Sequence, residues 1–105
     1  MSPRKWRGLT PLEKTVESHC DELMTKMGWD VVRFSQPRAS RQTRGIPDRK
    51  YYNGQRTFWF ECKAEDGRQS VHQKAFQKMC EAAGEAYVLG GLAELTDYLK
   101  KVRAA

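Results

Sequence analysis

The stretch from residue 48 to residue 63 reads DRKYYNGQRTFWFECK and decides how the middle of the chain folds. Asn53-Gly54 is the strongest short signal for a β-hairpin, and β-branched and aromatic residues flank it on both sides. The pattern therefore predicts two antiparallel strands. If the loop between them has two residues, Tyr52 faces Gln55 and Asp48 lies opposite Trp59.

This register places three charged side chains on one face of the hairpin. Asp48 falls on the same face as Glu61 and Lys63, because side chains alternate along a strand. Asp48 then lies diagonal to Glu61, at roughly 7 to 8 Å between backbones, a separation that two carboxylates can bridge to hold one metal ion. A slip of one residue would send Asp48 to the opposite face. The turn sequence thus predicts a candidate metal site as well as a hairpin.

Helical spacing precedes the hairpin. From Leu9 to Met27, apolar residues recur at steps of three and four, which predicts a helix with one buried face, and Gly28 can end it. A short strand over 29–34 and a polar, basic loop over 36–45 are predicted to follow. The buried face of the helix is predicted to hold Leu12, Val16, Cys20, Leu23 and Met27.

A second helix and a fourth strand are predicted after the hairpin. Ser70 and Gln73 match a capping box that opens the helix, and Gly84 closes it. The strand, over 86–89, should run parallel to the one that carries Glu61, because the helix between them is a crossover. A final helix is predicted over 92–102. The apolar faces of the two helices are predicted to be Phe76, Met79, Cys80 and Ala83, and then Leu92, Leu95, Leu99 and Val102.

The predicted elements make up one domain. A chain of 105 residues can bury a single modest core and leaves little room for a second. The order is helix, three antiparallel strands, helix, parallel strand, helix. This order predicts an α/β fold with a mixed sheet flanked by helices.

The charge distribution favours a polyanionic partner. The formal net charge is +6, and between residues 33 and 50 there are six basic residues against one acid, Asp48. Basic side chains bind nucleic acid by displacing counterions from its phosphates. We therefore expect a nucleic acid as the partner.

Cysteine usage and apolar content indicate a cytoplasmic, intracellular protein. Cys20, Cys62 and Cys80 form no zinc-ligand spacing with either histidine and fall within apolar patterns, so we expect three buried thiols in a reducing compartment. No apolar run reaches the length of a membrane span, and the basic N-terminus lacks the apolar stretch of a secretory signal. We expect no membrane association.

Two short motifs resemble the signature of a nuclease superfamily. Gly45-Ile46-Pro47-Asp48, followed by Glu61-Cys62-Lys63, is similar to the bipartite motif of the PD-(D/E)xK nucleases, whose core is restriction-endonuclease-like. Each half alone is common, and their joint placement is much more specific. The chain further resembles the virus-type replication-repair nuclease (VRR-NUC) domains. That closer resemblance lies in the acidic first helix ending in Gly28-Trp29 and in Ser70-x-x-Gln73.

The resemblance assigns roles to individual residues. It implies that Asp48 and Glu61 bind Mg²⁺ or Mn²⁺, that Lys63 is the catalytic lysine and that Gln73 assists in the active site. It also implies an accessory carboxylate on the first helix, for which Glu17 is the candidate and Glu13 the rival. Gln73 could instead simply complete the helix cap. The alternative for Asp48, Glu61 and Lys63 is a surface ion-pair network.

The resemblance also implies a substrate. Stand-alone members of the family are similar to phage enzymes that cleave branched DNA as homodimers, including four-way (Holliday) junctions, and the module serves DNA repair. Two alternatives are an inactive nucleic-acid-binding module of the same fold and a nuclease acting on flap or linear DNA. Arg38, Arg41 and Arg44 are predicted to contact phosphates, and Lys74 and Lys78 to extend that surface. His72 is expected to face solvent, and Trp6 either stacks on a base or packs in the dimer.

Overall fold

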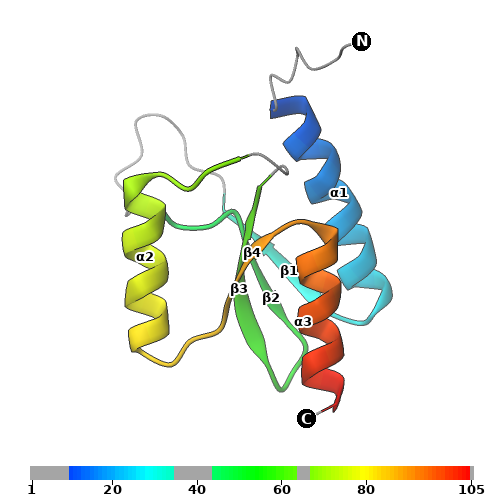
Figure 1. Cartoon of the computed structure of the whole chain (residues 1–105). Helices are drawn as coiled ribbons and strands as arrows, with labels where there is room; N and C mark the ends of the chain where they lie inside the picture. The colour runs from blue at the N-terminus through cyan, green and yellow to red at the C-terminus, as the bar shows by residue number, and fades with distance from the viewer. Residues whose placement is uncertain (1–9, 35–43, 64–66, 105) are drawn as a thin grey trace.

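The structure is a computed structural model that describes residues 10–34, 44–63 and 67–104. A four-stranded sheet lies between two layers of helices, with α1 and α3 on one face and α2 on the other (Figure 1). The predicted α/β class and the predicted order of elements are confirmed. In chain order the elements are α1 (Thr10–Lys26), β1 (Asp30–Arg33), β2 (Arg49–Tyr52), β3 (Thr57–Cys62), α2 (Val71–Ala82), β4 (Tyr87–Gly90) and α3 (Leu92–Ala104).

The sheet has the order β1-β2-β3-β4. The β1–β2 and β2–β3 pairs are antiparallel, whereas β4 runs parallel to β3. The parallel pair follows from the crossover through α2, which carries the chain back to the end of the sheet where β3 begins. The predicted direction of β4 is therefore confirmed, and both β3 and β4 end at the same edge of the domain.

The larger core lies between the sheet and the layer formed by α1 and α3. Alternate side chains of β3, namely Phe58, Phe60 and Cys62, face this layer, while Trp59 and Glu61 face α2. On the other side of the sheet, Phe76 of α2 packs edge-on against Trp59, with ring centroids 5.1 Å apart. The buried members of the larger core are Cys20, Met24, Trp29, Tyr51, Phe58, Phe60, Cys62, Val88, Leu95 and Leu99.

The predicted hairpin loop is two residues too short. Tyr52 pairs with Thr57, so the loop has four residues, 53–56. Asn53 explains the difference, because its Oδ1 accepts hydrogen bonds from the amides of Gln55 (3.0 Å) and Arg56 (2.8 Å) and so stabilises a wider turn. The register moves by two residues, which leaves every side chain on its predicted face.

The helix ends follow the predicted capping residues. Ser70 and Gln73 form the complete capping box of α2, and Gly28 and Gly84 adopt positive φ after α1 and α2. The three cysteines are free and buried, as expected. Within residues 10–34, 44–63 and 67–104, no helix is long and apolar enough to cross a membrane.

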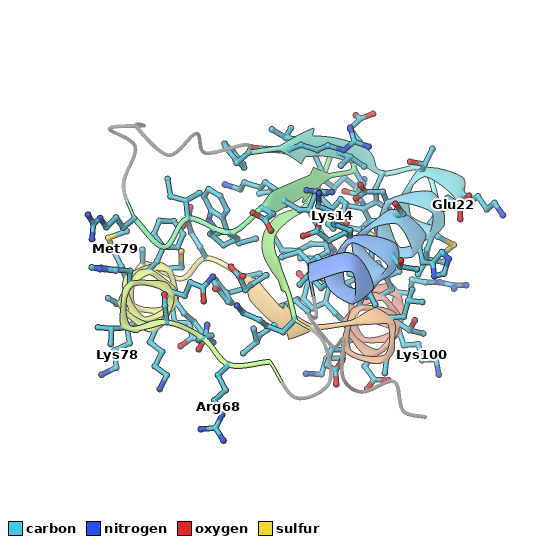
Figure 2. The ribbon with its side chains drawn as sticks, turned by 90° about the horizontal axis from the view of Figure 1, so that it is seen from above. Lys14, Glu22, Arg68, Lys78, Met79 and Lys100 are labelled. Atoms are coloured by element: carbon cyan, nitrogen blue, oxygen red, sulfur yellow. The ribbon has the colours of Figure 1, made fainter. Side chains whose placement is uncertain are left out.

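Parts of the predicted apolar faces are wrong. Met27 is 43% exposed and Met24 is fully buried in its place, because the chain turns at Gly28 and the buried face ends one turn earlier. Met79 is 57% exposed on the outer side of α2 (Figure 2), since this helix packs against the β4 side of the sheet and buries only a narrow face. Ala83 and Leu92, at the ends of their helices, are also exposed.

Candidate functional site

The candidate site lies where β3 ends and β2 begins. Glu61 is the penultimate residue of β3 and is 3% exposed, and Lys63 directly follows the strand. The β2–β3 register, continued one residue beyond Arg49↔Phe60, places Asp48 beside Glu61. The prediction that Asp48 lies diagonal to Glu61 and opposite Trp59 is therefore wrong, since Lys50 takes the position opposite Trp59. Directly opposed residues of neighbouring strands are closer than diagonal ones, so the correction brings the two carboxylates nearer together.

Two polar groups hold the carboxylate of Glu61. Gln73 Nε2 donates a hydrogen bond to Glu61 Oε2 over 2.9 Å, and Lys63 Nζ lies 3.8 Å from the same oxygen. The side chains of Lys63 and Glu61 are only 18% and 4% exposed, so their attraction is weakly screened by water. The ammonium group of Lys63 and the carboxylate of Glu61 therefore lie side by side at the end of β3.

Gln73 serves the helix cap and the candidate site at once. Its Oε1 accepts from the amide of Ser70 (2.8 Å), while its amide nitrogen donates to Glu61. The two interpretations left open by the sequence are thus compatible, because a glutamine amide has an acceptor end and a donor end. The cap fixes the side chain that in turn orients the carboxylate.

Glu17 of α1 contributes another carboxylate. Burial, a hydrogen bond to Asp48 and the negative charge of Asp48 together raise the pKa of Glu17 to about 7. The positive charge of Arg49, whose Nη2 lies 3.5 Å from Glu17 Oε1, lowers it in part. Glu17 therefore keeps its proton up to near-neutral pH. The side chain of the rival, Glu13, lies outside the described residues.

Arg49 ties the site to the rest of the domain. Its Nε donates to both oxygens of the buried Asp21, over 3.0 and 3.1 Å, and its Nη1 donates to the backbone oxygen of Asp48 over 3.1 Å. Tyr51 donates its hydroxyl to Asp21 as well, over 2.9 Å. One guanidinium thus connects α1 with the start of β2 and touches both Glu17 and Asp48.

Sequence reasoning missed this network. In the sequence, Arg49 stood out only as one of the basic residues near Asp48 that favour a polyanionic partner. The available signal was spacing: Glu17 and Asp21 are four residues apart on one helical face, and Arg49 and Tyr51 are two apart on one strand face. Nothing in the sequence alone indicates that these two faces meet.

Gly45 brings the segment before Asp48 against α2. It has a φ of +87°, and a Cβ at this position would collide with the backbone carbonyl of His72 and lie 2.9 Å from the amide nitrogen of Gln73. Two residues later, Pro47 is fully buried. The Gly-x-Pro-Asp segment therefore packs on the first turn of the helix that carries Gln73, which explains why glycine stands there.

Gly45→Ala should destabilise the protein by about 2–4 kcal/mol, because it combines a strained φ with a backbone collision. Gly54→Ala is the matched control, since Gly54 also has a positive φ (+91°) but open space around it. Urea denaturation of both variants separates the two effects. Equal losses of stability in the two variants would show that the contact with His72 contributes nothing.

The structure describes only some of the basic residues that were predicted to contact phosphates. Arg44 Nη1 lies 3.4 Å from His72 Nε2, and Lys74 and Lys78 are exposed on α2, with Lys78 pointing away from the sheet (Figure 2). His72 is exposed, as expected. Arg44 thus lies beside His72 in the first turn of α2. The residue that follows His72 in the chain, Gln73, contacts Glu61. Arg38, Arg41 and Trp6 lie outside the described residues.

The donor set of the site suits a hard divalent cation. Glu17, Asp48 and Glu61 offer only carboxylate oxygens, which are the ligands that Mg²⁺ and Mn²⁺ prefer. Glu17 holds a proton beside Asp48 that a cation could replace, since either one offsets negative charge at this position. Among the described residues, no three or more His, Cys, Asp or Glu side chains already stand in the arrangement of a metal centre.

Compared with known proteins, the chain matches no family model, no curated protein and no solved structure.

Proposed function

We propose that this protein is a metal-dependent endonuclease with a restriction-endonuclease-like core, similar to the VRR-NUC branch of the PD-(D/E)xK superfamily. One observation carries the proposal. Carboxylates from α1, from the residue before β2 and from the end of β3 lie at one end of the sheet, and Lys63 lies beside Glu61. A surface ion-pair network does not account for a 3%-exposed glutamate that a helix-capping glutamine orients.

In this proposal the carboxylates bind the metal ion and Lys63 stabilises negative charge. Asp48 and Glu61, with Glu17 as the accessory ligand, would hold Mg²⁺ or Mn²⁺. The ion when bound polarises the phosphodiester and acidifies a water molecule. Lys63 adds a positive charge that offsets the negative charge developing on the phosphate oxygens. Gln73 keeps Glu61 Oε2 in place.

Arg49 supports this arrangement through its contacts with both first-helix acids. Its charge favours the ionised form of Glu17, which is the form that binds a cation. Its hydrogen bond to the backbone oxygen of Asp48 fixes the start of β2. Arg49 is therefore a positioning residue in the proposed enzyme.

The proposed substrate is branched DNA, including four-way junctions, cleaved in the cytoplasm by a homodimer. The net charge of +6, the exposed Arg44 near the first turn of α2, and the exposed Lys74 and Lys78 on the same helix support binding to phosphates. A four-way junction is close to two-fold symmetric, so a two-fold dimer would present one site to each of two paired strands. The prediction from the sequence that Arg38 and Arg41 also contact phosphates is part of this proposal.

A panel of labelled DNAs tests the function and the substrate together. Linear duplex, single-stranded, flap and four-way-junction DNA are incubated with Mg²⁺, with Mn²⁺ and with a chelator. We expect cleavage only with metal and fastest on the junction, and light scattering should give twice the chain mass of 12.2 kDa. DNA binding without cleavage under any condition would instead identify an inactive binding module, and preferential cleavage of flaps by a monomer would replace the proposed substrate.

Glu17→Gln should raise stability above pH 7. Because the pKa of Glu17 is about 7 in the folded protein and near 4.5 in an exposed glutamate, the folded state keeps a proton that the unfolded chain releases earlier. This contribution is fully present below about pH 4.5 and is lost as the pH rises to about 7. Allowing for partial exposure of the side chain, the variant should gain on the order of 1–2 kcal/mol at pH 8.

Urea denaturation at pH 4.5 and pH 8 measures this effect. Glu22→Gln, on the exposed side of the same helix (Figure 2), is the control and should follow the wild type at both pH values. A Glu17→Gln variant that is less stable than the wild type at pH 8 would contradict the raised pKa of Glu17 in the folded protein.

A further inference from the structure

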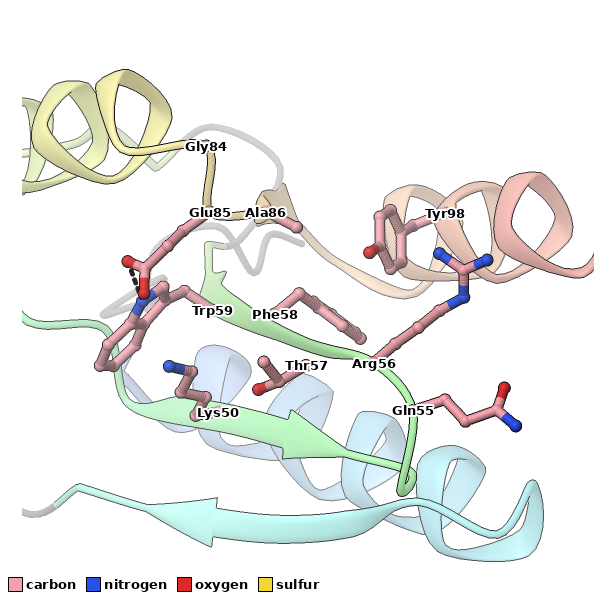
Figure 3. A pocket seen from close by; sticks show the side chains of 10 residues that line it. All are labelled: Lys50, Gln55, Arg56, Thr57, Phe58, Trp59, Gly84, Glu85, Ala86 and Tyr98. Carbon is pink, nitrogen blue, oxygen red and sulfur yellow. Dashed lines mark hydrogen bonds between the residues drawn. The ribbon is translucent and has the colours of Figure 1, made fainter. Parts of the chain in front are cut away.

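A cavity of about 340 Å³ lies at the end of the sheet opposite the candidate active site (Figure 3). The first β3–β4 pair is Trp59↔Tyr87, so Thr57 and Phe58 extend beyond the start of β4. The cavity occupies the space beside this edge of β3, between the hairpin, residues 84–86 and Tyr98 of α3.

Positive charge at this cavity is not already neutralised. Lys50 and Arg56 both line it, and in the described part of the chain neither forms an ion pair, whereas Arg33, Arg49 and Lys63 all do. The acid in the lining, Glu85, accepts a hydrogen bond from Trp59 Nε1 over 3.3 Å. The lining of the cavity thus carries two cations and one carboxylate, which leaves one excess positive charge.

Aromatic rings form the wall next to these cations. The rings of the buried Phe58 and of Tyr98 pack in a tilted contact with centroids 4.4 Å apart, and the guanidinium of Arg56 reaches toward Tyr98 (Figure 3). Lys50 Nζ lies 4.4 Å from the centroid of the Trp59 ring. Positive groups beside aromatic rings recognise a ligand that carries a phosphate and a flat base.

The cavity and the candidate active site lie along the same two strands. Lys50↔Trp59 is the next pair on the sheet face that carries Asp48 and Glu61, and two residues along a strand advance roughly 7 Å. That advance is of the order of the separation between neighbouring phosphates in an extended single strand. A strand that is cleaved at the site can therefore reach the Lys50–Trp59 end of the cavity within one or two nucleotides.

We propose that this cavity binds one unpaired nucleotide of the substrate strand, outside the bond that is cut. The guanidinium of Arg56 binds its phosphate and its base packs against Tyr98, while Lys50, beside Trp59 at the other end of the cavity, adds positive charge. The volume is at the lower end of the range for small organic ligands, so one nucleotide enters and a base pair does not. The identity of the ligand rests on the proposed nuclease function, and the site would select DNA that has unpaired nucleotides near a branch.

Thymidine 5′-monophosphate is a direct probe, because it needs neither metal nor cleavage. It is titrated into ¹⁵N-labelled protein alongside thymidine and inorganic phosphate. We expect the largest shifts at the indole N–H of Trp59 and at the amides of 55–59 and 84–86, with tighter binding than either fragment. Shifts located elsewhere, or equal binding of inorganic phosphate, would overturn the nucleotide site.

Arg56→Ala should weaken this binding about tenfold, whereas Arg56→Lys should retain most of it. Lys100→Ala, which removes a charge from an exposed position of α3 outside the cavity lining (Figure 2), is the control and should change nothing. Unchanged affinity in a folded Arg56→Ala protein would also overturn the proposal. Because the probe is not cleaved, a failure here leaves the nuclease standing, and a protein without nuclease activity could still bind the nucleotide.

Discussion

Asp48→Asn and Glu61→Gln should each lower DNA cleavage by about 10³-fold or more, because each removes a charged ligand of the proposed metal ion and several kcal/mol of transition-state stabilisation. Both substitutions preserve shape, so the fold should persist. DNA binding in the presence of a chelator should be unchanged, since the basic residues remain. Lys63→Ala should lose most of the activity while retaining metal affinity.

Cleavage of labelled four-way-junction DNA measures these losses, with gel-shift assays for binding. Glu22→Gln is the control, because it removes a carboxylate from an exposed position of α1 away from the site. An Asp48→Asn protein that cleaves as fast as the wild type would remove the nuclease assignment. Loss of DNA binding together with activity would instead indicate that Asp48 acts through the DNA surface.

Asp21→Ala should lower the free energy of unfolding by about 3–5 kcal/mol, because it leaves the buried Arg49 guanidinium without its main partner. The Tyr51 hydroxyl also loses its acceptor. For a domain of this size, such a loss lowers the melting temperature by more than about 12 °C. The expected effect is large because the side chains of Arg49 and Asp21 are only 12% and 11% exposed.

Calorimetry and urea denaturation measure the change in stability. Asp97→Ala, on the exposed face of α3, removes the same charge and should alter stability by less than about 0.5 kcal/mol. If Asp21→Ala behaved like Asp97→Ala, the contacts of Arg49 would not hold α1 to the sheet. The account of how Glu17 and Asp48 are positioned would then fail.

The fold was predictable where local chemistry and periodicity act together. The capping box of Ser70 and Gln73 fixed the start of α2, and the crossover fixed the direction of β4. The hairpin was predictable from Asn53-Gly54, but its length was not, because the Asn53 side chain bonds two amides of the turn. The sheet face of Asp48 was nevertheless predicted correctly, because the register moved by two residues and side chains alternate between the faces.

The candidate site was predictable as a set of residue types and less so as an arrangement. Spacing along β2 and β3 brought Asp48, Glu61 and Lys63 to one end of the sheet. The partners that arrive from other layers depend on tertiary packing, which spacing alone does not encode. The Arg49–Asp21 contact joins residues 28 positions apart, and the packing of Gly45 on His72 depends on where α2 lies.

The central claim is that Glu17, Asp48 and Glu61 bind a divalent cation. Binding of Mn²⁺ tests this claim without any assumption about the DNA. Substoichiometric Mn²⁺ is added to ¹⁵N-labelled protein, because this paramagnetic ion broadens the signals of nearby amides. The account predicts selective loss of the amide signals of Glu17, Asp48, Glu61, Lys63 and Gln73, intact signals from the hairpin loop 53–56, and no such loss in Asp48→Asn. Broadening that is uniform, lies elsewhere or persists in Asp48→Asn would contradict the claim.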